Sequence, residues 1–114
     1  MAFERLGNNT AFQQVYRKGK TRANQNLVMV VLKDCEGPTR YGFSVSKKVG
    51  NSVTRHRVTR LLREAVRKYD ADVTAGNHVV IIARPVVSER DLNDICRSIV
   101  KLYKAHHIWK ERSV

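Results

Sequence analysis

Hydrophobic residues recur at helical spacing in three segments of the chain, and signals for a helix start or end accompany them. In the first segment, Thr10 and Gln13 have the pattern of a capping box, and Gly19 suits the helix end. Before the third segment, Ser88 and Asp91 resemble another cap. The first two predicted helices cover about residues 10–18 and 52–69, and the third carries its apolar stripe from Leu92 and runs to about Lys104 or beyond. Their apolar stripes are Phe12, Val15 and Tyr16; Val58, Leu61, Leu62, Ala65, Val66 and Tyr69; and Leu92, Ile95, Cys96, Ile99 and Tyr103.

Three shorter apolar segments predict β-strands. The strands cover residues 27–32, 40–46 and 78–83. The first and last are continuous apolar runs, as in buried strands, whereas the middle one alternates, with Tyr41, Phe43 and Val45 on one side. We expect the first two to pair as a hairpin. The order α-β-β-α-β-α predicts an α+β fold, a two-layer sandwich with the helices packed on one sheet. A strand–helix–strand crossover is right-handed by default.

Charge is the most informative part of the composition. The 114 residues fit a single domain over residues 1–114, and they include 22 Lys and Arg against 10 Asp and Glu, a formal net charge of +12. Such an imbalance predicts a polyanionic partner, either nucleic acid or an anionic membrane surface. No apolar run is long enough to cross a bilayer, and the first residues lack the apolar core of a signal peptide. We expect a cytoplasmic protein with two reduced cysteines.

The second predicted helix concentrates the positive charge. On a helical wheel, His56, Arg60, Arg63 and Arg67 lie opposite the apolar stripe, and Arg55 lies near its edge at the helix start. The other charged residues of this region are Arg57, Glu64 and Lys68 on one flank, and Lys47 and Lys48 before the helix. Guanidinium groups bind phosphate in a bidentate manner, and a helix N-terminus also favours phosphate. A solvated charged face is the alternative, but one acidic residue against seven cations favours nucleic acid.

Aromatic residues of the first helix and the histidines offer less specific signals. Phe12 and Tyr16 fit two roles, stacking on single-stranded bases or docking the helix on the core. His106 and His107 are adjacent, so their side chains diverge on a helix and share a metal ion poorly. No paired-carboxylate motif or nucleophile elbow is present. We expect no catalytic residue, no metal site and no cofactor bound by the protein alone.

Consecutive motifs around the second helix have a recognisable pattern. They are Phe43-Ser44-Val45-Ser46-Lys47-Lys48-Val49-Gly50-Asn51-Ser52-Val53, then Arg55-His56-Arg57, then Arg60-Leu61-Leu62-Arg63-Glu64. With these motifs, and with flanking segments over about residues 3–104, the chain resembles the bacterial ribonuclease P protein component. The family commonly has Asn where this chain has His56, often has a basic residue at Thr59, and in some members has an aromatic at Val30. These departures concern the particular contacts at those three positions.

This resemblance implies a fold and a function. The fold would be a four-stranded mixed sheet, one strand being very short, in the order α-β-β-(β)-α-β-α, with a left-handed crossover through the second helix. The catalyst would be a large partner RNA that uses Mg²⁺ to remove the 5′ leader of precursor tRNA. The protein would be the accessory subunit of this ribonucleoprotein endoribonuclease, binding both RNAs.

By position, the resemblance also assigns residues to the two RNAs. Those that would bind the catalytic RNA are Lys47, Lys48, Arg55, His56, Arg57, Arg60, Arg63 and Arg67. Those that would bind the precursor leader are Phe12, Tyr16, Ser44 and Ser46. The main alternative is a ribosomal or other structural RNA-binding protein of the same size and charge. A helix-turn-helix DNA binder needs a helix where the sequence before Gly50 predicts a strand. A membrane-surface protein needs an exposed apolar face. We therefore expect neither DNA nor membrane as partner.

Overall fold

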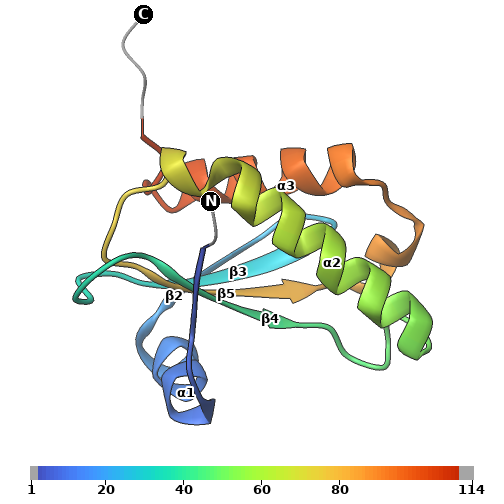
Figure 1. Cartoon of the computed structure of the whole chain (residues 1–114), viewed down its shortest axis with the longest axis horizontal. Helices are drawn as coiled ribbons and strands as arrows, with labels where there is room; N and C mark the ends of the chain where they lie inside the picture. The colour runs from blue at the N-terminus through green and yellow to red at the C-terminus, as the bar shows by residue number, and fades with distance from the viewer. Residues whose placement is uncertain (1–2, 111–114) are drawn as a thin grey trace, which may run out of the picture.

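The computed structural model describes residues 3–110, and within that range it has one mixed sheet of five strands, three α-helices and two short 3₁₀ helices (Figure 1). The strands are β1 (Glu4–Arg5), β2 (Lys20–Ala23), β3 (Leu27–Leu32), β4 (Arg40–Ser44) and β5 (His78–Ala83). The helices are α1 (Asn9–Lys18), α2 (Ser52–Tyr69), α3 (Leu92–Ala105), η1 (Asp70–Asp72) and η2 (Pro85–Glu89). The predicted α+β class is confirmed, with one strand more than the four that the resemblance implied.

The elements with the strongest hydrophobic pattern have the predicted bounds. The strands β3 and β5 and the helix α2 span the predicted residues 27–32, 78–83 and 52–69. Asn51 caps α2, because its side chain accepts a hydrogen bond of 2.9 Å from the backbone N–H of Thr54. Gly19 caps the end of α1, and its N–H donates to the carbonyl of Val15. In these segments the local signals and the tertiary packing agree.

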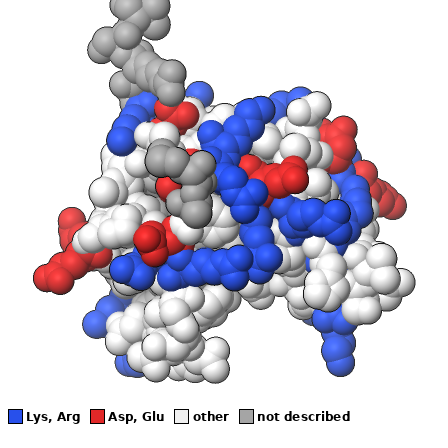
Figure 2. Space-filling view, viewed as in Figure 1, with Lys and Arg blue, Asp and Glu red and all other residues white. Residues whose placement is uncertain are grey.

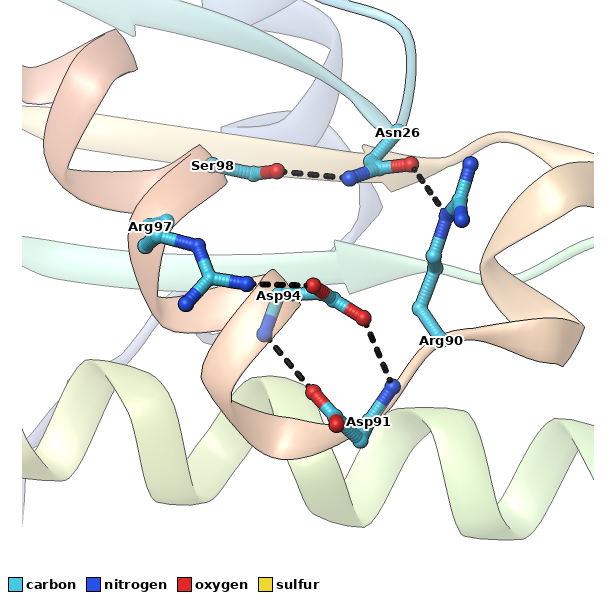
Figure 3. A network of polar contacts seen from close by, with 6 residues as sticks. All are labelled: Asn26, Arg90, Asp91, Asp94, Arg97 and Ser98. Atoms are coloured by element: carbon cyan, nitrogen blue, oxygen red, sulfur yellow. Dashed lines mark hydrogen bonds and ion pairs between the residues drawn. The ribbon is translucent and has the colours of Figure 1, made fainter.

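Two predicted helix caps are wrong. The first helix starts one residue earlier than expected, and Asn8, not Thr10, supplies the capping oxygen. Of the two candidate caps of the third helix, Asp91 supplies the cap, whereas Ser88 lies within η2. Both regions contain several residues with capping side chains in succession, and pattern alone does not choose among them. Asp91 forms its capping box with Asp94, in which each side chain accepts from the other's backbone N–H (Figure 3).

The predicted hairpin between the strands at 27–32 and 40–46 is also wrong. The strand order is β1-β4-β5-β3-β2, so β5 lies between β3 and β4, antiparallel to the first and parallel to the second. β5 is apolar on both faces, and a central position buries both of them. Residues 33–39 connect β3 to β4 around it. β4 ends at Ser44, two residues earlier than predicted, and the edge strands β1 and β2 were missed because their side chains are all exposed.

The crossover from β4 through α2 to β5 is left-handed. In Figure 1 both strands run from left to right, α2 lies above the sheet, and β4 is nearer the viewer than β5. A path that rises over the sheet and returns to a strand farther away turns in the left-handed sense. The default of a right-handed crossover is therefore wrong here, as the family resemblance implied.

Helices cover both faces of the sheet. α2 and α3 lie on one face and α1 on the other (Figure 1). The larger core fills the space under α2 and α3, and it includes Leu27, Met29, Tyr41, Val58, Leu62, Ile81, Ile95 and Ile99. A smaller core under α1 consists of Leu6, Val15, Val30 and Val80. The predicted two layers describe the α2 and α3 side, and α1 adds a partial third layer.

A polar network fixes the start of α3 against the turn between β2 and β3. The Asn26 amide donates to the Ser98 hydroxyl over 2.8 Å, and its carbonyl oxygen accepts from Nε of Arg90 over 3.1 Å (Figure 3). Asn26 and Ser98 are both buried, so these bonds satisfy polar groups that water cannot reach. The network joins η2, α3 and the sheet into one unit.

Candidate nucleic-acid interface

The helix α2 presents a cationic face to solvent because its opposite face is held in the core. Val58, Leu62, Ala65 and Val66 are buried, as the predicted stripe requires. The residues on the outer side include His56, Arg60 and Arg67, which are exposed. In the view of Figure 2, Lys and Arg side chains gather over α2 with few acidic ones among them. The sequence-based division of α2 into an apolar and a cationic face is therefore present in the structure.

No acidic side chain of the described residues forms an ion pair with these charges. Among residues 3–110 one ion pair is formed, between Arg97 and Asp94 on α3. No carboxylate lies within ion-pair distance of the α2 cations in the same range. Like charges on one helix face repel each other, so a polyanion that covers this face relieves the repulsion. The face therefore suits a partner with closely spaced negative charges.

The arginines of α2 differ in how many of their guanidinium N–H groups are free to bind a partner. The guanidinium of Arg57 donates to two backbone carbonyls, that of Ser88 over 3.2 Å and that of Arg90 over 3.0 Å. Arg57 thus ties α2 to η2, a partner that the sequence did not indicate. Arg55 and Arg63 are half-buried, and the Nε–H of each has no hydrogen-bond partner among the described residues. Their stems lie along the helix surface while their ends remain near solvent.

The loop before α2 adds two further cations. Lys47 and Lys48 are exposed in a turn that Ser46 closes, with its carbonyl accepting from the N–H of Val49 and its hydroxyl from that of Lys48. Ser46 therefore lies outside the strand to which it was assigned, and its hydroxyl serves the turn. A hollow of about 190 Å³, lined partly by Arg55 and His56, lies beside the first turn of α2.

A second surface lies on the α1 side of the sheet. Phe12 rests its ring on Gly42, where an added Cβ would overlap the ring, so the ring docks α1 on β4. Tyr16, one turn on, is 46% exposed. Ser44 is in register with Ile82, two positions along from Gly42, so both half-buried side chains face the α1 side. The docking role of Phe12 is therefore present, and Tyr16 keeps an accessible ring.

The predicted residues thus fall into two groups on opposite faces of the sheet. The arginines and His56 lie on α2, whereas Phe12, Tyr16 and Ser44 lie on the α1 side. Gly42 and Ile82, which complete the second surface, were not predicted, because their contribution depends on strand pairing. Within residues 3–110, no group of three or more His, Cys, Asp or Glu could hold a metal ion. In the same range, no helix is long and apolar enough to span a membrane.

A mixed sheet with a left-handed crossover and an exposed cationic helix face defines a small, basic α+β protein that suits a polyanionic partner. Comparison with known proteins specifies the family. The Ribonuclease P family model matches residues 1–107. The chain is 44% identical over 105 residues to the ribonuclease P protein component of Lachnoclostridium phytofermentans, covering 92% of this chain and 90% of that protein. It is 40% identical over 111 residues to the component of Brevibacillus brevis, covering 96% and 88%.

Solved structures agree with this relationship. The Staphylococcus aureus RNase P protein superposes with a TM-score of 0.83 at 29% identity, over 93% of this chain and 97% of that one. The Thermotoga maritima RNase P protein gives 0.81 at 26% identity, over 90% and 96%. The chain belongs to the ribonuclease P protein family, the protein subunit of a ribonucleoprotein endoribonuclease of tRNA processing. The family match decides against the ribosomal alternative, and the partner is an RNA.

Proposed function

We propose that the chain contacts two RNAs through its two surfaces. The cationic face of α2, with Lys47 and Lys48, docks on the catalytic RNA subunit of ribonuclease P. The α1 side, with Phe12, Tyr16 and Ser44, holds the single-stranded 5′ leader of precursor tRNA. The observation that carries this proposal is the α2 face, whose cations have no acidic partner among the described residues.

The α2 face suits a folded RNA. His56, Arg60 and Arg67 are exposed and offer donors along one side of the helix, about one turn and then two turns apart, which can follow a phosphate backbone. Each phosphate contact releases counterions, so this binding weakens steeply with salt. The remaining assigned arginines, Arg55, Arg57 and Arg63, are partly buried or already bonded, and they contribute fewer free donors.

The α1 side suits an unpaired strand. Single-stranded RNA exposes base faces that stack on aromatic rings, and each such contact contributes about 1–3 kcal/mol. Tyr16 offers an accessible ring, and Ile82 and Ser44 offer an apolar and a hydroxyl contact on the neighbouring sheet. Mature tRNA lacks the leader, so a leader contact distinguishes precursor from product.

Chemistry would then reside in the RNA. The protein needs no cofactor of its own, while Mg²⁺ serves the RNA-containing holoenzyme by stabilising charge at the reacting phosphate. This function places the protein in the cytoplasm, together with both RNAs. The role of the protein is to raise affinity for the precursor and to position its leader.

Paired variants test the two surfaces separately. Arg60→Ala with Arg67→Ala should weaken binding to a bacterial ribonuclease P RNA about tenfold or more, with a shallower salt dependence. Lys101→Ala with Lys104→Ala removes the same charge from exposed positions of α3 and should have little effect. Equal binding by the two double variants in a filter assay would refute the docking role of α2.

The leader surface has its own measurement. In reconstituted holoenzyme, Tyr16→Ala should weaken binding of leader-bearing precursor about tenfold and leave leaderless tRNA unchanged. Gln13→Ala, on the exposed side of α1, is the matched control. An equal loss for both tRNAs would count against the leader assignment.

A further inference from the structure

A third basic feature lies apart from both surfaces, at the edge of the sheet formed by β2. A hollow of about 350 Å³, here called the β2-edge pocket, is bounded by the ends of α1, β3 and α3 and by β2 itself. Its charged lining consists of Lys18, Lys20, Arg22, Lys33 and Asp34, with the buried His106 in its wall. Four cationic side chains and one carboxylate, that of Asp34, therefore line the pocket.

The strand register explains why these cations converge. Lys20 pairs with Val31 and Arg22 with Met29, and both partners belong to the core under α3. The side chains of Lys20 and Arg22 therefore point to the α3 face, beyond the last buried strand. β2 is an edge strand with all four residues exposed, so solvent reaches the pocket from its outer side.

These cations are not used to cap α3. The carbonyls of the last helical turn already accept bonds from the backbone N–H groups of residues 106, 107 and 108. No side-chain hydrogen bond or ion pair engages Lys18, Lys20, Arg22 or Lys33 within the described residues. The buried ring of His106 hydrogen-bonds the carbonyl oxygen of Met29 over 2.9 Å, so one wall of the pocket is rigid. A rigid, positively charged hollow without internal partners suits an anion.

The β2-edge pocket lies away from the α2 face and from Ser44, while Lys18 in its lining follows Tyr16 by two residues at the end of α1. It adjoins Leu32, which pairs with His78 at the start of β5, whereas Ser44 pairs with Ile82 near its end. It also lies at the opposite edge of the sheet from β1 and β4. The nucleotides that contact α2 or Ser44 therefore do not also fill this pocket, and a separate RNA segment is needed.

We propose that the β2-edge pocket binds the phosphodiester backbone of RNA, as a third contact of the protein in the holoenzyme. The cationic lining favours a phosphate, and both the RNA subunit and the body of the precursor can supply one. The inference rests on the family's RNA partner, and not on the residues assigned to the α2 face or the leader.

The test removes two cations from exposed positions of the edge strand. Lys20→Gln with Arg22→Gln should weaken RNA binding about tenfold and reduce the slope of log affinity against log salt by about 1.5–2. Lys101→Gln with Lys104→Gln is the control, since it removes the same charge from α3 outside the pocket lining. Thermal unfolding of both double variants checks that the fold is retained.

Two binding arms identify the source of the phosphate. Loss of affinity for a bacterial ribonuclease P RNA assigns the pocket to the RNA subunit. If affinity for the RNA subunit is unchanged but preassembled holoenzyme binds precursor and mature tRNA more weakly to the same extent, the pocket is assigned to the tRNA body. Binding equal to that of the control in both arms would overturn the inference. Because Arg60→Ala with Arg67→Ala tests α2 independently, failure here is distinguishable from failure of the proposed function.

Discussion

Replacing Arg57 by alanine should reduce the stability of the protein, in contrast to replacing its exposed neighbour Arg60. The Arg57 guanidinium bridges the carbonyls of Ser88 and Arg90, at distances of 3.2 and 3.0 Å. Arg90 in turn donates to Asn26, so the bridge connects α2 to the network at the start of α3. An arginine that lies among the proposed RNA contacts thus also holds two parts of the fold together.

The magnitude follows from the two bonds. A hydrogen bond with a charged partner contributes about 1.5–3 kcal/mol, but Arg57 is exposed, and water replaces part of each bond when it is lost. Ordering a long side chain also costs conformational entropy. We therefore expect a loss of about 1–2 kcal/mol in the free energy of unfolding. For a protein of this size, that corresponds to a fall of about 4–8 °C in the melting temperature.

Thermal and urea unfolding, followed by circular dichroism, measure this effect. Arg60→Ala removes the same charge from the same helix where no intramolecular bond is made, and its stability should stay within about 0.5 kcal/mol of the parent. Arg57→Lys keeps the charge but reaches both carbonyls poorly, so it should resemble Arg57→Ala in stability. An Arg57→Ala variant that melts at the parent temperature would refute the bridging role.

Three further perturbations have definite expected outcomes. Gly42→Ala should cost about 1–3 kcal/mol in urea unfolding, because its methyl group displaces the ring of Phe12, and unchanged stability would show that the ring moves freely. Asn26→Ala should cost about 1–3 kcal/mol by leaving the buried hydroxyl of Ser98 without its donor, whereas wild-type stability would mean that water replaces the amide. Burial, with nearby cations, lowers the pKa of His106, so the folded state binds fewer protons than the unfolded one, and stability should fall as pH drops below about 6.5. His106→Gln should flatten that dependence in unfolding measured from pH 8 to 5, and an unchanged slope would assign it to other groups.

The sequence predicted those elements whose hydrophobic pattern agrees with their final environment. The 52–69 helix is amphipathic from Val58 onward, and its predicted apolar stripe lies in the core, whereas Val53 in its first turn is exposed. The 27–32 strand is apolar throughout, and the 78–83 strand is apolar after His78, because both faces of those strands are covered. In contrast, β1 and β2 have exposed side chains and exist only through their pairing with β4 and β3. Such edge strands leave no periodic signal.

The site was predictable in composition but less so in geometry. A cationic helix face follows from the spacing of Arg60, Arg63 and Arg67 along one side of a wheel. The bond of Arg57 to Ser88 and Arg90 does not, because it joins segments about thirty residues apart whose approach depends on the packing of α2. The β2-edge pocket was missed for the same reason, since it combines cations from α1, β2 and the end of β3.

The segment between β4 and α2 determines how the two proposed RNA surfaces are related. Ser44 ends β4 on the α1 side, and a few residues later Asn51 caps α2 on the other side of the sheet. Val49 is buried in the larger core, and Ser46 closes the turn, so the segment is fixed at its base. An RNA bound along α2 is therefore held at a constant offset from a strand lying on Ser44. On the proposal made above, the rigidity of the fold can in this way position a leader relative to the catalytic RNA.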